Sequence, residues 1–396
     1  MCYNIPIELK KESPVMSYPV KIRRELHEYP EVGFDLPRTL ALLRRELDLM
    51  GVEYTEKYGK SSIVATVNPE KQGYTIAIRA DMDALPITET TDAPYKSKND
   101  GMMHACGHDA HTAIALAALE KINAMRDSID CRIKFLFQPA EEYRISGARL
   151  MAEDGVMEDI DVVIALHCDP GLDVGKIEII DGDRNAISNG FELHFYGKSA
   201  HAARRASGID AILMAARAYD ELVREVTPET IGERTVFNVG KIRGGETNNI
   251  VCDHCMMFAT LRSFSDEGAE RAFAKINEIC NRVSDDMGGK YEFVSVKHYP
   301  KVYNDPAVAD AIRTSAAKII GRENVGAEKR GLGGEDFSYF ANIKPGAMFK
   351  LGTRTPGCES YYGLHHDKFD IDESALDVGI EIFVRFVLDN MNGYKK

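Results

Sequence analysis

An eight-residue segment, HACGHDAH at 104–111, combines three histidines, one cysteine and one aspartate, although the whole chain has only 11 histidines. Gly107 lies between Cys106 and His108, where it loosens the backbone and lets the thiolate and the imidazole point to one place. These groups are the ligands that zinc favours, whereas carboxylates suit harder ions such as manganese. The segment therefore indicates a transition-metal site. The alternative is a solvated helix start, because a Cys-x-His spacing alone is a modest signal.

A second candidate is the acidic pair Glu141-Glu142, which follows the apolar run CRIKFLF after a QPA turn. Adjacent carboxylates repel each other, and a cation is the usual means of keeping both ionised. One of them could bind a metal while the other takes a proton from a metal-bound water, whose pKa zinc lowers from 15.7 to about 7. Taken alone, such a pair is more often an exposed acidic turn.

The elements that must position these residues follow from periodicity. Short β-rich runs alternate with helical stretches in the first half of the chain, which predicts an α/β fold with a mostly parallel sheet. Asp81 and Asp83 follow the strand YTIAIRA, and His167 closes the strand DVVIAL. Because ligands bind outside the carboxyl ends of such strands, we expect these residues and the glutamate pair to converge on one edge of the sheet. The next helix is expected to begin near Asp109, with that side chain as its cap.

The chain is predicted to hold two domains, one inserted in the other. Its 396 residues exceed the usual size of one compact core. From about residue 187 the pattern becomes strand-helix-strand-strand-helix-strand, the order of a ferredoxin-like α+β module. After residue 303 the α/β pattern returns and ends in an amphipathic helix. The predicted boundaries are 1–186 with 304–396 for the α/β domain, and 187–303 for the insertion.

Composition argues against several classes of partner. Lys and Arg number 49 against 62 Asp and Glu, a net charge of −13, and no basic block appears, so nucleic acid is not an expected partner. The first 20 residues lack the apolar core of a leader, and no segment reaches the length of a membrane span, so we expect a cytoplasmic protein. The eight cysteines lack framework spacing, and those of CDHC at 252–255 are expected to be buried thiols.

Several segments occur in the order and at the intervals of a known family: RADMDALPI, GMMHACGHDAHTA, FQPAEE, ALH, GKSAHAA, GGEDFS and LHHDKFDID. On these segments the chain resembles the amidohydrolase branch of the aminoacylase/carboxypeptidase di-metal peptidase superfamily. That branch includes hippurate hydrolases, indole-acetyl-amino-acid hydrolases and N-acetyl-diaminopimelate deacetylases. The resemblance runs from about residue 20 to the last helix, and MHACGHDAH and FQPAEE are its most specific segments.

The resemblance implies two divalent transition-metal ions, with zinc, manganese, cobalt and nickel all open. Its implied ligands are Cys106, which bridges both ions, His108 and His167 on one ion, and Glu142 and His365 on the other. Register selects His365 over His366, because the family pattern of Leu-His, three residues and Phe reads here as Leu364, His365 and Phe369. The role of His366 stays open. Asp83 is expected to support the ligands rather than bind metal.

The resemblance also assigns roles to the remaining site residues. Glu141 would be the general base. His201 would reach across a homodimer, or a higher homo-oligomer, formed through the inserted domain, and bond the oxyanion in the partner's active site. Asn249 and Arg262 would hold the substrate's carboxylate, an anion that a planar guanidinium suits. Without the resemblance, these three residues of the insertion read as ordinary surface or strand residues.

The implied function is a metal-dependent amidohydrolase that cleaves an N-acyl amino acid into a carboxylic acid and a free amino acid, through a metal-bridging water and Glu141. A dipeptidase or carboxypeptidase with the same metals is the nearest alternative, and a non-catalytic ligand-binding relative is a further one. The chain departs from the family at HAARRASG, where Arg204 and Arg205 stand near the position of a usual proline. They could meet an anionic part of the substrate, or simply form a solvated basic pair.

Overall fold

The computed structural model describes residues 16–358 and 361–394, which divide into two compact units. The larger unit takes the chain up to Gly182, Tyr303–Lys329, and the chain from Asp336 onward, and the smaller unit takes Asp183–Val302 and Arg330–Glu335. Most of the N-terminal stretch examined for a leader lies outside the described residues.

The larger unit is built on an eight-stranded sheet in the order β1-β2-β4-β3-β5-β16-β6-β15. Its centre is parallel, because β3 pairs in parallel with β4 and β5, and β5 pairs in parallel with β16. The central strands β3 and β4 are buried along almost their whole length, as expected where helices cover a parallel sheet. The prediction of an α/β fold with a mostly parallel sheet is therefore confirmed. The strands are β1 (Glu53–Thr55), β2 (Ile63–Val67), β3 (Thr75–Asp81), β4 (Arg132–Gln138), β5 (Val162–Asp173), β6 (Ile177–Ile179), β15 (Val325–Ala327) and β16 (Gly346–Arg354).

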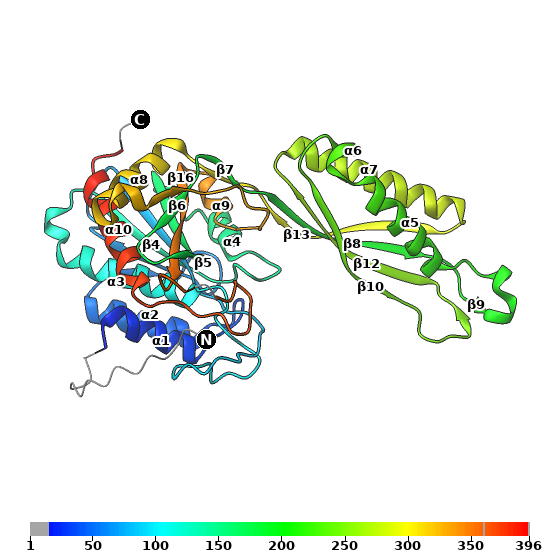
Figure 1. Cartoon of the computed structure of the whole chain (residues 1–396), viewed down its shortest axis with the longest axis horizontal. Coiled ribbons are helices and arrows are strands. Elements are labelled where there is room, and N and C mark those ends of the chain that lie inside the picture. The colour runs from blue at the N-terminus through cyan, green and yellow to red at the C-terminus, as the bar shows by residue number, and fades with distance from the viewer. Residues whose placement is uncertain (1–15, 359–360, 395–396) are drawn as a thin grey trace. The chain divides into compact units, whose positions relative to one another are not determined.

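Helices α1, α3, α10 and α8 contact one another in series and form one layer beside the sheet (Figure 1). Helix α3 is buried on nearly every side, which explains why its sequence is apolar all round. Helix α1 was not predicted, because its inner face buries Arg23 and His27 among apolar residues and so lacks a clear apolar stripe. The helices are α1 (Tyr18–Glu28), α2 (Pro37–Met50), α3 (His108–Ala124), α4 (Gly147–Glu153), α8 (Pro306–Ile320), α9 (Ser338–Ala341) and α10 (Ala375–Asn390), with 3-10 turns η1 (Arg126–Ser128) and η3 (Arg322–Asn324).

The smaller unit is a four-stranded antiparallel sheet, in the order β10-β12-β8-β13, with two long helices packed on one face. The chain forms β8 (Ile187–Tyr196), α5 (Ala211–Glu225), β10 (Val236–Gly244), β12 (His254–Ser263), α7 (Asp266–Asp286) and β13 (Lys290–Tyr299), which is the predicted strand and helix order. Its shorter elements are β9 (Ala200–His201), η2 (Ala202–Ser207), α6 (Pro228–Ile231) and β11 (Ile250–Val251). Strands β7 (Gly182–Asn185) and β14 (Val302–Asn304) form a separate two-stranded sheet.

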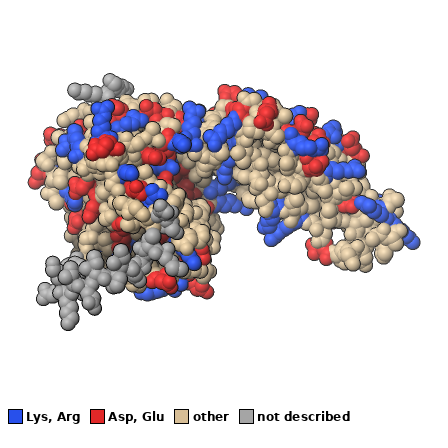
Figure 2. Space-filling model, viewed as in Figure 1, with Lys and Arg blue, Asp and Glu red and all other residues tan. Residues whose placement is uncertain are grey.

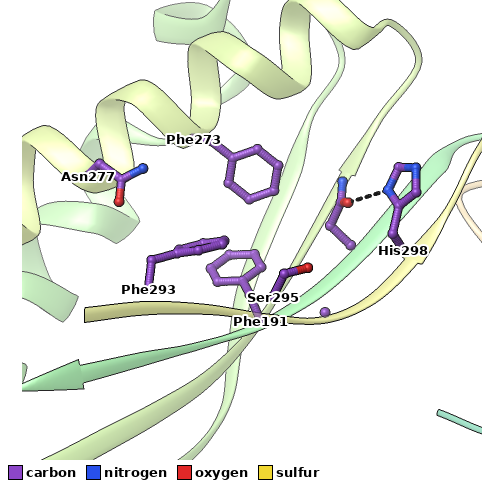
Figure 3. A pocket seen from close by; sticks show the side chains of 8 residues that line it. Phe191, Phe273, Asn277, Phe293, Ser295 and His298 are labelled. Atoms are coloured by element: carbon purple, nitrogen blue, oxygen red, sulfur yellow. Dashed lines mark hydrogen bonds between the residues drawn. The ribbon is translucent and has the colours of Figure 1, made fainter. Parts of the chain in front are cut away.

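A pocket of about 170 Å³ lies between α7 and the sheet of the smaller unit. Figure 3 shows the rings of Phe191, Phe273 and Phe293 gathered in it, with centroids 5.1–5.5 Å apart. At its other side, His298 Nδ1 donates to Asn189 Oδ1 at 2.7 Å. The pocket is a gap at one end of this unit's apolar core, and the residues predicted to bind substrate do not line it.

Charged side chains of both signs are interspersed on the face that Figure 2 shows. Within the described part of the chain, no helix combines the length and apolar character needed to cross a membrane. Seven cysteines are described, all are free thiols, and six of them are buried, the two of CDHC included.

Candidate metal centre

The larger unit brings all of its predicted site residues together at one edge of the sheet. Cys106, His108 and His167 offer ligand atoms that lie within 4.8 Å of one another. The same holds for Cys106, Glu142 and His365, so Cys106 belongs to both groups. Glu141 joins His108 and Glu142 in a third group of this kind. The geometry thus offers two donor sets with a shared thiol and one further carboxylate beside them.

Local backbone conformation explains how the two loops reach this edge. Gly107 adopts φ +85° directly before α3, and a Cβ there would lie 3.1 Å from the Cys168 Cβ, so only glycine fits the turn. Ala140 adopts φ +56° after β4 and turns the chain into the glutamate pair. Helix α3 begins at His108, with Gly107 as its N-cap and no side-chain cap. The prediction that Asp109 caps the helix is therefore wrong, because its carboxylate bonds Arg23 and His27 instead.

Backbone carbonyls fix the orientation of two histidines. His108 Nδ1 lies 2.8 Å from the carbonyl oxygen of Asp83, and His167 Nδ1 lies 2.8 Å from that of Cys168. A carbonyl only accepts, so each Nδ1 carries a proton, and in the neutral ring Nε2 keeps its lone pair. His167 Nε2 lies 3.6 Å from Cys106 Sγ. In its neutral form, each ring therefore directs toward the site a nitrogen of the kind that a metal binds.

Asp83 holds the turn that carries the glutamates. Its Oδ1 accepts from the backbone N–H of Glu141 at 2.9 Å, and its Oδ2 accepts from that of Glu142 at 3.1 Å. The carboxylate is buried, so both bonds are charge-assisted and shielded from water. Asp83 thus positions both glutamates and, through its carbonyl, His108.

The electrostatics of the site favour a cation. Burial raises the pKa of the Cys106 thiol well above its ordinary value, and the nearby carboxylates of Glu142 and Glu141 raise it further. Burial alone would lower the pKa of His108, but Asp81 and Cys106 raise it well above its usual value. Although burial opposes the charged form, His365 lowers the pKa of Glu142 to about 2, through a bond of 2.8 Å between Nε2 and Oε1. A divalent ion would stabilise the thiolate and both carboxylates together.

Several observations fit a bound metal. Among the described residues, His108 Nε2 is buried without a hydrogen bond, and the Asp81 carboxylate lies 3.5 Å from it. The donors are a thiol, imidazoles and carboxylates, a mixture typical of zinc and other divalent transition metals. His365 has φ +64°, a left-handed conformation that a non-glycine residue rarely adopts and that clusters at functional sites. His366 instead lies 2.9 Å from Asp367 and is in neither donor group.

Buried residues behind the donors complete the site. His111 Nδ1 lies 2.6 Å from Asp81 Oδ1, and His111 Nε2 accepts from the backbone N–H of Cys168 at 2.9 Å. Both ring nitrogens of His111 are thus bonded within the chain. The fully buried Arg79 bonds Asp81 at 2.7 Å and Asp336 at 2.8 Å. His111 stands in the HACGHDAH segment and Asp81 in the same Asp-Met-Asp run as Asp83, whereas no pattern in the sequence singles out Arg79.

In the smaller unit, His201 and Asn249 lie side by side. His201 pairs with Ile250 across β9 and β11, and the carbonyl of Asn249 accepts from the N–H of Ala202 at 2.9 Å. His201 Nδ1 accepts from the backbone N–H of Ala203 at 3.1 Å, so the neutral ring carries its proton on Nε2. The His201 side chain is exposed and therefore presents a hydrogen-bond donor at the surface.

Arg262 lies on β12, and its guanidinium is half-buried. Burial lowers the pKa of Arg262, and no carboxylate among the described residues forms an ion pair with it. A partly desolvated guanidinium without an acidic partner is suited to an anionic ligand. Arg205, by contrast, pairs with Asp210 at 3.0 Å, and both Arg204 and Arg205 are exposed.

Comparison with known proteins identifies relatives of the whole chain. The model of peptidase family M20/M25/M40 matches residues 77–389. The chain is 33% identical over 371 residues to the N-acetylcysteine deacetylase of Bacillus subtilis, covering 93% of this chain and 96% of the relative. It is also 33% identical over 370 residues to thermostable carboxypeptidase 1 of Saccharolobus solfataricus, covering 91% of this chain and 92% of the relative.

A solved structure adds evidence on the metals. The YXEP protein of Bacillus subtilis, described as a dinuclear metal binding peptidase from the M20 family, matches with a TM-score of 0.79 and 31% identity. The match covers 94% of this chain and 97% of that protein. A putative aminohydrolase from methicillin-resistant Staphylococcus aureus matches with a TM-score of 0.85 and 30% identity, covering 94% of this chain and 96% of that one.

Proposed function

Because the chain belongs to peptidase family M20/M25/M40 and is a metal-dependent amide hydrolase, we propose that it cleaves N-acyl amino acids into a carboxylic acid and a free amino acid. The observation that carries this proposal is the pair of donor sets that share Cys106, with Glu141 beside them. The similarity to a deacetylase of an N-acetylated amino acid supports this substrate class.

We assign the two divalent ions to the two donor sets. Cys106, His108 and His167 would hold one ion, and Cys106, Glu142 and His365 would hold the other. When bound, such ions polarise an amide carbonyl and lower the pKa of water. Their identity stays among zinc, manganese, cobalt and nickel.

The proton transfers fall to Glu141. Its backbone is fixed by Asp83, and its carboxylate lies within the group formed with His108 and Glu142. Glu141 takes a proton from the attacking water and then passes it to the nitrogen of the leaving amine. Such positioned acid-base catalysis contributes about 10²- to 10⁴-fold to the rate.

The smaller unit would recognise the substrate. Arg262 and Asn249 would hold the carboxylate of the amino acid, supported by the absence of an acidic partner for Arg262 among the described residues. His201, with its proton on Nε2, would donate to the oxyanion in the active site of a second copy of the chain. Removal of one such donor typically costs about 10²- to 10³-fold in kcat.

The surface of the smaller unit supports pairing with a second copy. Strand β10 is an edge strand whose backbone groups on one side lack a neighbouring strand in the sheet. Helix α5, which contacts β10, exposes the apolar side chains of Ile212, Tyr219 and Val223 at helical spacing. An exposed edge beside an apolar stripe is suited to an interface between copies.

The test is a screen of metal-reconstituted protein against N-acetyl amino acids, N-benzoyl amino acids and dipeptides, with Glu141→Gln as the matched variant. We expect turnover of the N-acyl amino acids and a loss of about 10²-fold or more in kcat for Glu141→Gln, with metal content unchanged. Near-normal turnover by metal-loaded Glu141→Gln would refute the mechanism.

The second candidate function is a carboxypeptidase or dipeptidase, which the similarity to a thermostable carboxypeptidase favours. A higher kcat/KM for dipeptides than for N-acyl amino acids in the same screen would establish it. Turnover of no substrate by the fully loaded protein would instead indicate a non-catalytic relative.

A further inference from the structure

Arg23 lies at the centre of a buried ion-pair network behind the metal centre. It belongs to α1, is fully buried, and donates through all three guanidinium nitrogens. Nε lies 3.1 Å from Asp109 Oδ2, Nη2 lies 2.6 Å from Asp370 Oδ1, and Nη1 lies 3.1 Å from Glu373 Oε1. Tyr95 adds a bond of 2.8 Å from its hydroxyl to Asp370 Oδ2. A planar, forked cation is the side chain that can serve three carboxylates at once.

The carboxylates that Arg23 joins belong to two separate segments that carry metal donors. Asp109 directly follows His108 at the start of α3, and Asp370 lies five residues after His365. The two segments are more than 250 residues apart in the chain, and the side chain of Arg23 bonds both of them directly.

The histidines differ in how they are held. His108 and His167 are each fixed by a bond from Nδ1 to a backbone carbonyl. The His365 side chain is half-exposed and bonds only Glu142 among the described residues. Its place is set by its backbone, which has φ +64° and donates its N–H to the carbonyl of Ala105 at 2.7 Å. A strained backbone of this kind persists only where its surroundings hold it.

The anchors of the His365 segment lie downstream of it. Thr90 donates its N–H to the Asp367 carbonyl at 2.8 Å and its hydroxyl to the Asp367 carboxylate at 2.6 Å. The next anchor is the bond between Arg23 and Asp370 at 2.6 Å, and Glu373 bonds both Arg23 and Arg24. The N–H of Asp372 adds a bond to the carbonyl of Thr353 at 2.9 Å. Among these downstream anchors, those on Arg23 also reach the segment that carries Cys106 and His108, which the His365 N–H bonds directly at Ala105.

We propose that Arg23 is a positioning residue that clamps the 365–373 segment to the start of α3, so that His365 stays within reach of Cys106 and Glu142. The ion held by Glu142 and His365 therefore depends on this clamp more than the ion held by His108 and His167. This inference rests on the assignment of ligands in the proposed function.

The test uses two variants that weaken the ion pairs of Arg23 without leaving a cavity in place of its side chain. Asp370→Asn keeps the side-chain shape but removes the charge that Arg23 bonds. Arg23→Lys keeps a cation but lacks the fork that reaches both segments. The matched control is Asp389→Asn on α10, which also loses an ion-paired carboxylate, here one that pairs with Lys318 and Arg385. The exposed fractions of the two side chains are similar, 13% for Asp389 and 16% for Asp370.

The measurement is a titration of metal-free full-length protein with Co²⁺, followed by calorimetry and by the visible absorption of the bound ion. We expect two ions per wild-type chain. In Asp370→Asn and Arg23→Lys the first ion should bind as in the wild type, and the second should bind about 10- to 100-fold more weakly, as is typical when a partner of a metal ligand is lost. Asp389→Asn should bind both ions as the wild type does.

Wild-type affinity for both ions in Asp370→Asn would overturn the inference, and so would an equal loss in Asp389→Asn. Binding of fewer than two ions by the wild type would overturn it as well. If Arg23→Lys does not fold, the Co²⁺ titration of Asp370→Asn alone tests the inference. The titration needs no substrate, so a weakened second ion in Asp370→Asn supports the clamp even if the screen finds no turnover of N-acyl amino acids.

Discussion

Replacement of Asp83 by asparagine tests whether kcat depends on the backbone position in which Asp83 holds Glu141 and Glu142. The two carboxylate oxygens accept from the N–H groups of Glu141 and Glu142 at 2.9 and 3.1 Å. An asparagine side chain has one acceptor oxygen and one NH₂ group, so one of the two backbone N–H groups would face another donor. Asp83→Asn therefore removes one charge-assisted bond and turns one peptide unit of the loop away from its present position.

The expected magnitude follows from these two bonds. A buried donor left without a partner costs about 1–3 kcal/mol, and the loss of charge from the other bond adds to this, so metal-free Asp83→Asn should lose about 3 kcal/mol of unfolding free energy. The displaced Glu141 should lower kcat of the metal-loaded enzyme by about 10- to 100-fold. That range corresponds to about 1.4–2.7 kcal/mol of transition-state stabilisation.

The assay compares urea unfolding of the metal-free protein with kcat and KM of the loaded protein. Glu31→Gln is the matched control, because the buried carboxylate of Glu31 also accepts from two backbone N–H groups, those of Arg38 and Thr39 at 3.0 and 2.9 Å. It should lose similar stability while its kcat stays within about twofold of the wild type. If Asp83→Asn loses stability but keeps the kcat of Glu31→Gln, the positioning argument is refuted.

Three further predictions concern other parts of the molecule. Although burial alone would lower it, Asp109 raises the pKa of His27 to about 9, so the stability from the charged ring is complete below about pH 6.5 and lost as the pH rises through 9. Between those pH values the wild type should lose about 3 kcal/mol of unfolding free energy that His27→Gln does not lose. Urea titrations at several pH values measure this difference, and the same pH dependence in both proteins would contradict the assignment. Arg262→Met should raise KM for N-acyl amino acids about 10- to 100-fold with little change in kcat, whereas equal loss in kcat would place the guanidinium in the chemical step. Val223 is 52% exposed, and Val223→Asp should give monomers in light scattering. These monomers should also lose the contribution of His201 to kcat. Dimers of Val223→Asp would show that this face of α5 is not the interface between copies.

The sequence by itself determined the candidate ligands and most of the elements that carry them. Cys106, His108 and the glutamate pair are candidates from residue type and spacing. His167 is a candidate because a strand is predicted to end there, but β5 continues to Asp173, so that His167 lies within the strand. The physical reason is local: strand and helix periods are read from neighbouring residues, and the carboxyl ends of parallel strands necessarily share an edge of the sheet.

Only the tertiary structure decided how the side chains are partnered. Asp109 was expected to cap its own helix, but its partners Arg23 and His27 come from α1, more than 80 residues earlier. Helix α1 was missed for the same reason, since its buried charged residues make sense only beside those partners. Likewise, the backbone strain of His365 and the lack of an acidic partner for Arg262 in the described chain depend on packing between distant segments. Residue types set what each group can bind, but the partner of a buried charge is chosen by the fold, because burial is what makes an unpaired charge costly.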